Sequence, residues 1–331
     1  MRTEADGPIG AKPERCQCPV CGMPARVGER FCEACGSGLA VVPIEAGEGR
    51  PTVPPEKVPR IEFDLGSAAA VSDRGRRRPR NEDAVSILVD NGRSVAVVCD
   101  GVASTVDAHR AAQVASRAAL AVLRPLAEAA RWPDHETLIS TFGAAVLTAQ
   151  AEVSSLVPGP YHLDLSPSTT LVAGLAGPGK VAVAGVGDSR AYWLTEAPER
   201  SRLLTVDDSW AQEQIAAGVD PGLAYDHPGA HTITRWIGAG AEMPGAGVTV
   251  IEVGEPGLLV LCSDGLWNYF EAPERLARQA ARSGDRSAAG IARDLARAAL
   301  RAGGQDNITV AVIPVEPQVS STDDGPTTKE E

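Results

Sequence analysis

The sequence predicts a layered α+β domain in which antiparallel sheets are packed between helices. Short runs rich in β-branched residues arrive in consecutive groups, which is typical of antiparallel sheets rather than of alternating βαβ units. Long alanine-rich segments between these groups have the spacing and length of helices. Many of the expected strands carry apolar residues at both alternating positions, so both faces of each sheet should be covered.

Composition narrows the possible classes of function. The chain has 331 residues, of which 44% are hydrophobic and 22% charged, and these values are ordinary for a globular protein. A net charge of −12 and an aromatic content of 4% argue against a nucleic-acid partner, which needs a broad basic face or stacking platforms. No apolar run is long enough to cross a membrane, and the N-terminus shows no secretory core. We therefore expect a cytoplasmic protein with no membrane partner.

The N-terminal segment, residues 1–45, contains five of the seven cysteines. Four of them form two Cys-x-x-Cys pairs, Cys18 with Cys21 and Cys32 with Cys35. Two such pairs can surround one tetrahedral Zn²⁺ ion, and the segment resembles a zinc ribbon. The fifth cysteine, Cys16, could replace Cys18. Because the segment is too short for a hydrophobic core, structural zinc would supply its folding energy.

The charges of this zinc-ribbon-like segment nearly balance, with no basic stripe along it. Such a surface favours docking of a protein over contact with DNA. We expect the partner to be a cognate kinase or another protein, and we expect the segment to leave catalysis untouched.

The rest of the chain divides into three parts. Residues 46–60 are rich in proline and predict an extended linker. Residues 316–331 form a polar tail that we expect to be disordered. Between them, residues 61–315 form one block, in which Cys99 and Cys262 lie in apolar runs and should be buried. The expected strands cover 84–89, 94–100, 168–176, 180–187, 190–194, 248–253, 257–263 and 307–315, and the expected helices cover 108–131, 134–156, 273–282 and 287–302.

Acidic residues stand at the ends of five expected strands. They are Glu82–Asp83, Asp100 before Gly101, Asp188, Asp264 before Gly265, and Asp306 before Asn307. Any single one of them could be a turn former or a helix cap. Together they would repel one another strongly unless cations neutralised them. Oxygen ligands without histidine suit Mg²⁺ or Mn²⁺ rather than Zn²⁺, so the pattern predicts a site for such ions.

An arginine-rich stretch, residues 74–80, directly precedes the first of these acidic sites. Five arginines in seven residues could form a nucleic-acid or targeting patch. Next to a cluster of carboxylates, however, an arginine could receive an anion held against the metal ions. Metal ions and arginine together indicate phosphate chemistry.

Six motifs occur in an order that resembles the metal-dependent Ser/Thr protein phosphatases of type 2C. They are SDRGRRRPRNED at 72–83, VCDG at 98–101, STTL at 168–171, VGDSR at 186–190, CSDG at 262–265 and GQDN at 304–307. The resemblance covers about residues 61–315. It implies a four-layer α-β-β-α sandwich of two antiparallel sheets, and hydrolysis of phosphoserine and phosphothreonine in opposition to Ser/Thr kinases.

The resemblance also assigns roles to residues. Asp100 would bridge two Mn²⁺ or Mg²⁺ ions, one also held by Glu82 and the Gly101 carbonyl, the other by Asp264 and Asp306. Asp188, with help from Asp264, would bind a weaker third ion. Arg78 would grip the phosphate, Asp83 and Asn307 would support the metal ligands, and residues 212–237 would form a flap beside the site. Two cations would acidify a water molecule that attacks phosphorus without a phosphoenzyme.

One departure from the family pattern concerns residues 102–107, which lack the usual Gly/His-containing loop, so the acid that protonates the leaving group stays open. We expect His109 to be a surface residue at a helix start.

A different class of function is a catalytically silent scaffold or partner-binding module. A silent copy should have lost a metal ligand, and none is lost. A third possibility is a regulator acting on anti-anti-sigma factors, which usually carries sensor domains that this chain lacks.

Overall fold

The computed structural model describes residues 59–157, 166–241, 245 and 247–318, together with the backbone of three short strands. These strands are β1 (Arg15–Gln17), β2 (Pro24–Arg26) and β3 (Val41–Pro43). The four predicted zinc ligands lie outside the described residues, as do the linker up to residue 58 and the tail from residue 319. No helix in the described part of the chain has the length and hydropathy to cross a bilayer.

Two sheets form the centre of the molecule. The first has the order β14-β10-β9-β7-β6, with bounds Val248–Glu252, Lys180–Val186, Leu171–Gly177, Arg93–Cys99 and Ala84–Asp90. The second has the order β12-β11-β15-β16-β5-β4-β3. The bounds of its first six strands, in this order, are Arg202–Leu203, Arg190–Thr195, Gly257–Cys262, Ile308–Val315, Ala69–Asp73 and Arg60–Asp64. Neighbouring strands are antiparallel, except that β3 pairs with β4 in parallel.

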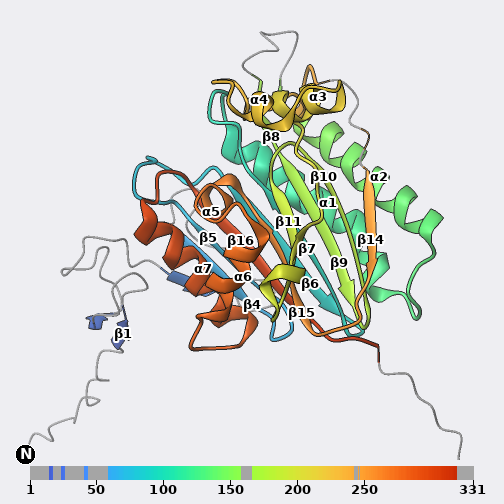
Figure 1. Ribbon diagram of the computed structural model, residues 1–331, viewed down its shortest axis with the longest axis vertical. Coiled ribbons are helices and arrows are strands. Elements are labelled where there is room, and N and C mark those ends of the chain that lie inside the picture. Colours follow the sequence, from blue (N-terminus) through green and yellow to red (C-terminus); the bar gives the residue numbers. More distant parts are fainter. Residues whose placement is uncertain are drawn as a thin grey trace, which may run out of the picture.

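Helices cover the outer face of each sheet, which gives four layers (Figure 1). Helices α1 (Ala108–Glu128) and α2 (His135–Ser154) pack on the five-stranded sheet. Helices α6 (Pro273–Ala281) and α7 (Ala288–Ala302) pack on the seven-stranded sheet. The described residues therefore confirm the layered α+β fold with two antiparallel sheets.

The apolar residues at both strand positions explain why the sheets can be stacked. In β7, Val95, Val97 and Cys99 face the helices α1 and α2, whereas Ala96 and Val98 face the other sheet. In β16, the same alternation directs one set toward α7 and the other between the sheets. Each central strand thus buries side chains on both faces, which is the main hydrophobic contribution to stability. Cys99 and Cys262 are buried free thiols, as predicted.

The expected strands and long helices are present, with boundaries shifted by a few residues. Several strands were not expected, among them β4 and β5, because their sequences RIEFD and AAVSD are short and carry no strong strand signal. Three short helices were also not expected: α3 (Trp210–Ala216), α4 (Pro221–Tyr225) and α5 (Asp264–Trp267). The first two belong to the flap segment 212–237 and lie at one end of the sandwich (Figure 1).

A small two-stranded sheet joins this end of the sandwich. Strand β8 (Ser168–Thr169) pairs with β13 (Ile237–Gly238), which connects the end of the flap segment to the start of β9. A 3-10 helix, η3 (Pro198–Arg200), follows β11 on the seven-stranded sheet.

Candidate active site

The predicted acidic ligands all lie where strands begin or end. Asp100 follows β7, Asp188 follows β10, and Asp264 follows β15 as the first residue of α5. Glu82 precedes β6, and Asp306 precedes β16. Because the strands are held on both faces, these positions are fixed by the core rather than by loops.

Asp100 is held through its backbone by Thr169, the last residue of β8, and by Thr170, which lies between β8 and β9. Its N–H donates to the hydroxyl of Thr170 at 3.0 Å. Its carbonyl accepts from the N–H of Thr170 at 2.8 Å and from the hydroxyl of Thr169 at 2.8 Å. The next residue, Gly101, forms a bridge with Thr169, and a Cβ there would lie 2.7 Å from the carbonyl oxygen of Glu82. Glycine is therefore required where these two segments meet.

The carboxylates lie close enough together that their mutual repulsion raises the pKa values of several of them. Burial raises the pKa of Asp100 well above its usual value, and repulsion from Asp83, Asp264, Asp188 and Asp306 adds to the effect. Burial and repulsion by Asp264 raise the pKa of Asp188 to about 7, and burial with repulsion by Asp306 raises that of Asp264 to about 6. Burial also raises the pKa of Glu82. Such a cluster of partly buried acids is typical of a functional site and favours a cation.

The donor set fits hard divalent cations. It consists of oxygen atoms alone, and the Oδ1 atoms of Asp264 and Asp83 are buried without a hydrogen-bond partner. Among the described residues, no three acidic, histidine or cysteine groups already surround one point as a bound ion requires.

Arg78 lies in the arginine-rich loop and reaches the acidic cluster. Its Nη2 is 2.5 Å from Oδ2 of Asp306, and the Arg78 side chain is 36% exposed. The hydrogen bond to Asp306 raises the pKa of Arg78, so the guanidinium stays cationic. A partly exposed cation beside carboxylates can receive a phosphate oxygen from solvent.

Asn307 connects the arginine-rich loop to the start of β16. Its Oδ1 accepts from the N–H of Glu82 at 2.7 Å. Its Nδ2 donates to the carbonyls of Arg74 and Arg80 at 2.8 and 2.9 Å. The side-chain amide thus fixes the position of Glu82 beside the cluster, with its oxygen engaged as an acceptor and its nitrogen as a donor to two carbonyls.

Asp83 lies deeper than Glu82. Its Oδ2 accepts from the hydroxyl of Ser263 at 2.8 Å, and this hydroxyl accepts from the N–H of Thr309 at 3.0 Å. Ser263 directly precedes Asp264, so Asp83 ties the strands that carry two of the acidic residues. Burial raises the pKa of Asp83 to about 7.

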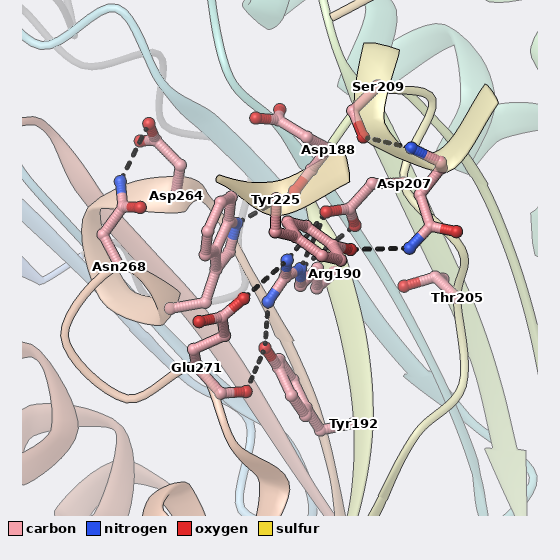
Figure 2. Close-up of polar contacts among 12 residues, drawn as sticks. Asp188, Arg190, Tyr192, Thr205, Asp207, Ser209, Tyr225, Asp264, Asn268 and Glu271 are labelled. Atoms are coloured by element: carbon pink, nitrogen blue, oxygen red, sulfur yellow. Dashed lines mark hydrogen bonds and ion pairs between the residues drawn. The ribbon is translucent and has the colours of Figure 1, made fainter. Parts of the chain in front are cut away.

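A buried ion pair that the sequence did not indicate lies beside Asp188 (Figure 2). The guanidinium of Arg190 donates to both oxygens of Asp207, with distances of 2.7–3.1 Å. It also stacks on Trp267, 3.8 Å from the ring centroid. The indole of Trp267 donates to the carbonyl of Asp188 at 2.9 Å, and Trp267 ends the helix α5 that begins at Asp264. This arrangement links the start of the flap to two acidic residues of the cluster.

The flap segment lies over the loop that follows Asp100. A cavity of about 270 Å³ separates them, lined by Val102, Ser104, Thr105, Ser168, Thr232, Ile233, Trp236 and Gly240. Asp208 holds the flap from below, because its carboxylate accepts from Arg235 and from the N–H of Gly187. Trp210 stacks on His227, with ring centroids 4.2 Å apart. Trp236 therefore borders a cavity beside the site, while Trp210, just before the flap, packs on His227 of the flap.

The prediction for His109 was wrong. The side chain is 7% exposed, and its Nδ1 lies 3.2 Å from Nη1 of Arg80. The reason is that the arginine-rich loop packs over the start of α1, which a helix pattern alone does not reveal. The loop 102–107 has the sequence VASTVD and supplies no histidine as a leaving-group acid.

Comparisons with known proteins agree with one another. The family described as Protein phosphatase 2C matches residues 74–301. The serine/threonine phosphatase stp of Listeria innocua is 30% identical over 251 residues, covering 73% of this chain and 93% of that protein. The solved serine/threonine phosphatase of S. agalactiae is 26% identical, with a TM-score of 0.60, covering 75% of this chain and 99% of that one. The catalytic domain of the phosphatase PstP, solved with 2 manganese ions, is 29% identical with a TM-score of 0.58, covering 75% and 98%.

Proposed function

Since the chain belongs to the bacterial protein phosphatase 2C family and is a serine/threonine protein phosphatase, we propose that its acidic residues at strand ends form the catalytic centre. The observation that carries this assignment is the gathering of carboxylates around Asp100, whose pKa is raised by burial and by repulsion from Asp83, Asp264, Asp188 and Asp306, with Arg78 hydrogen-bonded to Asp306. Phosphorylated proteins are the substrates that this family membership implies.

The residues fall into two sets of ligands that share Asp100. Glu82, Asp100 and the carbonyl of Gly101 would hold one Mn²⁺ or Mg²⁺ ion, and Asp100, Asp264 and Asp306 would hold a second. Asp188, with Asp264, would hold a weaker third. When bound, such ions supply Lewis acidity, which lowers the pKa of water and neutralises charge on the phosphoryl oxygens.

The protein's own groups then position the substrate. Arg78 would exchange its hydrogen bond with Asp306 for the phosphoryl oxygens, which a guanidinium can bind in a bidentate manner. Asn307 would hold Glu82 in place by accepting a hydrogen bond from the backbone N–H of Glu82. Asp83 would hold the segment before Asp264 by accepting a hydrogen bond from the hydroxyl of Ser263. These supports reduce the motion of ligands that repel one another, and such preorganisation is a large part of catalysis.

The test is hydrolysis of p-nitrophenyl phosphate and of a phosphothreonine peptide, with Mn²⁺ or with EDTA. We expect turnover that requires Mn²⁺ and that falls by about a hundredfold or more in Asp100→Asn, because this residue serves both ligand sets. Asp90→Asn is the matched control, since Asp90 ends β6 at the end opposite Glu82. Folded, Mn²⁺-loaded protein without turnover would contradict the proposal and favour the silent scaffold.

We propose a separate role for the N-terminal segment: Cys18, Cys21, Cys32 and Cys35 bind one structural Zn²⁺, and the segment docks a partner such as a cognate kinase. The support is the Cys-x-x-Cys spacing. Deleting residues 1–40 tests it while leaving β3 beside β4. The full chain should contain one zinc ion and the shortened chain none, with equal turnover of p-nitrophenyl phosphate. A tenfold loss of turnover would show that the segment takes part in catalysis.

A cytoplasmic location is likewise a proposal, which cell fractionation can test.

A further inference from the structure

The arginine-rich loop between β5 and β6 carries more positive charge than the proposed mechanism uses. Arg78 contacts Asp306, and Arg80 contacts His109. The side chains of Arg76 and Arg77 are exposed and have no ion-pair or hydrogen-bond partner within the described ranges 59–157, 166–241 and 247–318. Two unpaired guanidinium groups on an acidic protein represent an available binding surface for an anion.

The backbone of this loop is fixed in place. The N–H of Gly75 donates to Oδ1 of Asp73 at 2.8 Å, and the N–H of Arg76 donates to the carbonyl of Gly304 at 2.7 Å. Gly75 has φ +73°, and a Cβ there would lie 2.0 Å from the carbonyl oxygen of Asp306. The loop therefore lies directly on the segment that carries Asp306. An anion that meets Arg76 and Arg77 does not have to order the backbone first, which favours binding.

The position of the two arginines relative to Arg78 sets the size of the ligand. Consecutive Cα atoms are about 3.8 Å apart, so Arg76 and Arg77 lie within about 8 Å of Arg78 along the backbone. An extended peptide advances about 3.3 Å per residue. A phosphate bound at Arg78 would thus place a second anionic group, two to four residues away, about 7–13 Å from it. Arginine side chains can cover this distance.

We propose that Arg76 and Arg77 bind a second anionic group of the phosphoprotein substrate, within about four residues of the phosphate that is removed. This inference rests on the proposed function and adds a substrate class to it: peptides with two phosphates, or with one phosphate and a nearby acidic side chain. Arginine clusters recognise such groups through charge-assisted hydrogen bonds. A nucleic-acid ligand fits less well, because the net charge of −12 would repel a long polyanion.

The test compares three phosphothreonine peptides of otherwise identical sequence. The first has alanine around the phosphothreonine, the second has glutamate two to four residues away, and the third has a non-hydrolysable phosphonate there. We expect kcat/KM of the wild type to be about tenfold higher for the phosphonate peptide than for the alanine peptide. The glutamate peptide distinguishes a general acidic preference from a preference for a second phosphate.

The double variant Arg76→Gln/Arg77→Gln should lose most of this preference and keep its turnover of p-nitrophenyl phosphate. The matched control is Arg278→Gln/Arg282→Gln, which removes two exposed arginines at α6, in the outer helix layer. It should behave as the wild type. Raising the salt concentration should reduce the preference in the wild type and in the Arg278→Gln/Arg282→Gln control, because exposed charges are screened, and it should have little effect on the Arg76→Gln/Arg77→Gln variant.

Binding of the labelled phosphonate peptide, measured by fluorescence anisotropy, tests the inference without turnover. A preference below twofold, an unchanged preference in the double variant, or tighter binding of a labelled RNA oligonucleotide would overturn it. The proposed function fails in a different way, through absence of Mn²⁺-dependent turnover of p-nitrophenyl phosphate in every protein. In that case the anisotropy comparison still decides whether Arg76 and Arg77 bind the second anion.

Discussion

Removal of the Asp207 carboxylate is the sharpest test of the packing beside the acidic cluster. Asp207 is 6% exposed and its partner Arg190 is 3% exposed, so neither charge is solvated in the folded protein. In Asp207→Ala, the guanidinium stays buried on the face of Trp267. It keeps a hydrogen bond to the hydroxyl of Tyr192 at 3.2 Å and a contact with the exposed Glu271 at 3.6 Å.

The expected loss arises because the buried guanidinium would keep only the distant, exposed carboxylate of Glu271 as an ionic partner. Breaking a buried ion pair by removing one partner costs about 3–5 kcal/mol. For a domain of this size, each 1 kcal/mol lowers Tm by roughly 2–4 °C. Asp207→Ala should therefore lower Tm by roughly 6–20 °C. Because Trp267 donates to the carbonyl of Asp188 and belongs to the helix that begins at Asp264, the variant should also bind Mn²⁺ more weakly.

The neighbouring pair supplies the control. Asp208 pairs with Arg235, whose side chain is 44% exposed. An exposed pair contributes about 0–1 kcal/mol, so Arg235→Gln should shift Tm by at most a few degrees. Thermal unfolding followed by circular dichroism measures both variants. Equal and small shifts would refute the reasoning, as would a double variant Arg190→Leu/Asp207→Leu that is much less stable than Asp207→Ala alone, since replacing both charges removes the unpaired one.

Three further predictions concern the site. The folded-state pKa values of Asp264 and Asp188 are raised to about 6 and about 7, so the stability that comes from protonating these two groups is present at low pH and is lost as pH rises through about 6–7. With EDTA, Tm should therefore fall between pH 5.5 and 8, and Mn²⁺ should raise Tm more at pH 8; a Tm that rises with pH in EDTA would contradict this. Gly265→Ala should destabilise by about 3 kcal/mol or more, because a Cβ would lie 1.8 Å from the carbonyl oxygen of Asn307. Gly143→Ala, in helix α2 with nothing within 4 Å, should instead stabilise by roughly 0.5–1 kcal/mol, and denaturant unfolding of both tests the contrast. Asn307→Ala removes hydrogen bonds to Glu82, Arg74 and Arg80, and should cost about 1–3 kcal/mol and weaken Mn²⁺ binding; unchanged calorimetric binding of Mn²⁺ would show that the loop is held by other contacts.

Sequence patterns were sufficient for the central layers of the fold. The strand around Cys99 has apolar residues at every position from Val95 onward, and the structure buries both of its faces. The acidic residues could be found for a related reason. They directly flank such strands, so their positions follow once the strands are known.

Contacts between distant segments were not predictable in the same way. Asn307 reaches the backbone of Glu82 across 225 residues, and Ser72 meets Thr309 across 237. The pair of Arg190 with Asp207 depends on where Trp267 is placed by another strand. The burial of His109 depends on the arginine-rich loop, which is far from α1 in the sequence. Local periodicity does not encode these distances, and the short helices α3 and α4 are too brief to show a period.

The central claim is that the carboxylates at the strand ends hold the catalytic cations. Isothermal titration calorimetry of Mn²⁺ into the full chain, into Asp100→Asn and into Asp90→Asn tests it most directly. We expect two ions to bind tightly to the wild type and to Asp90→Asn, and tight binding to be lost in Asp100→Asn, because both ligand sets share Asp100. If Asp100→Asn binds two Mn²⁺ ions with the affinity of the wild type, the strand-end carboxylates are not the metal centre and the account is wrong.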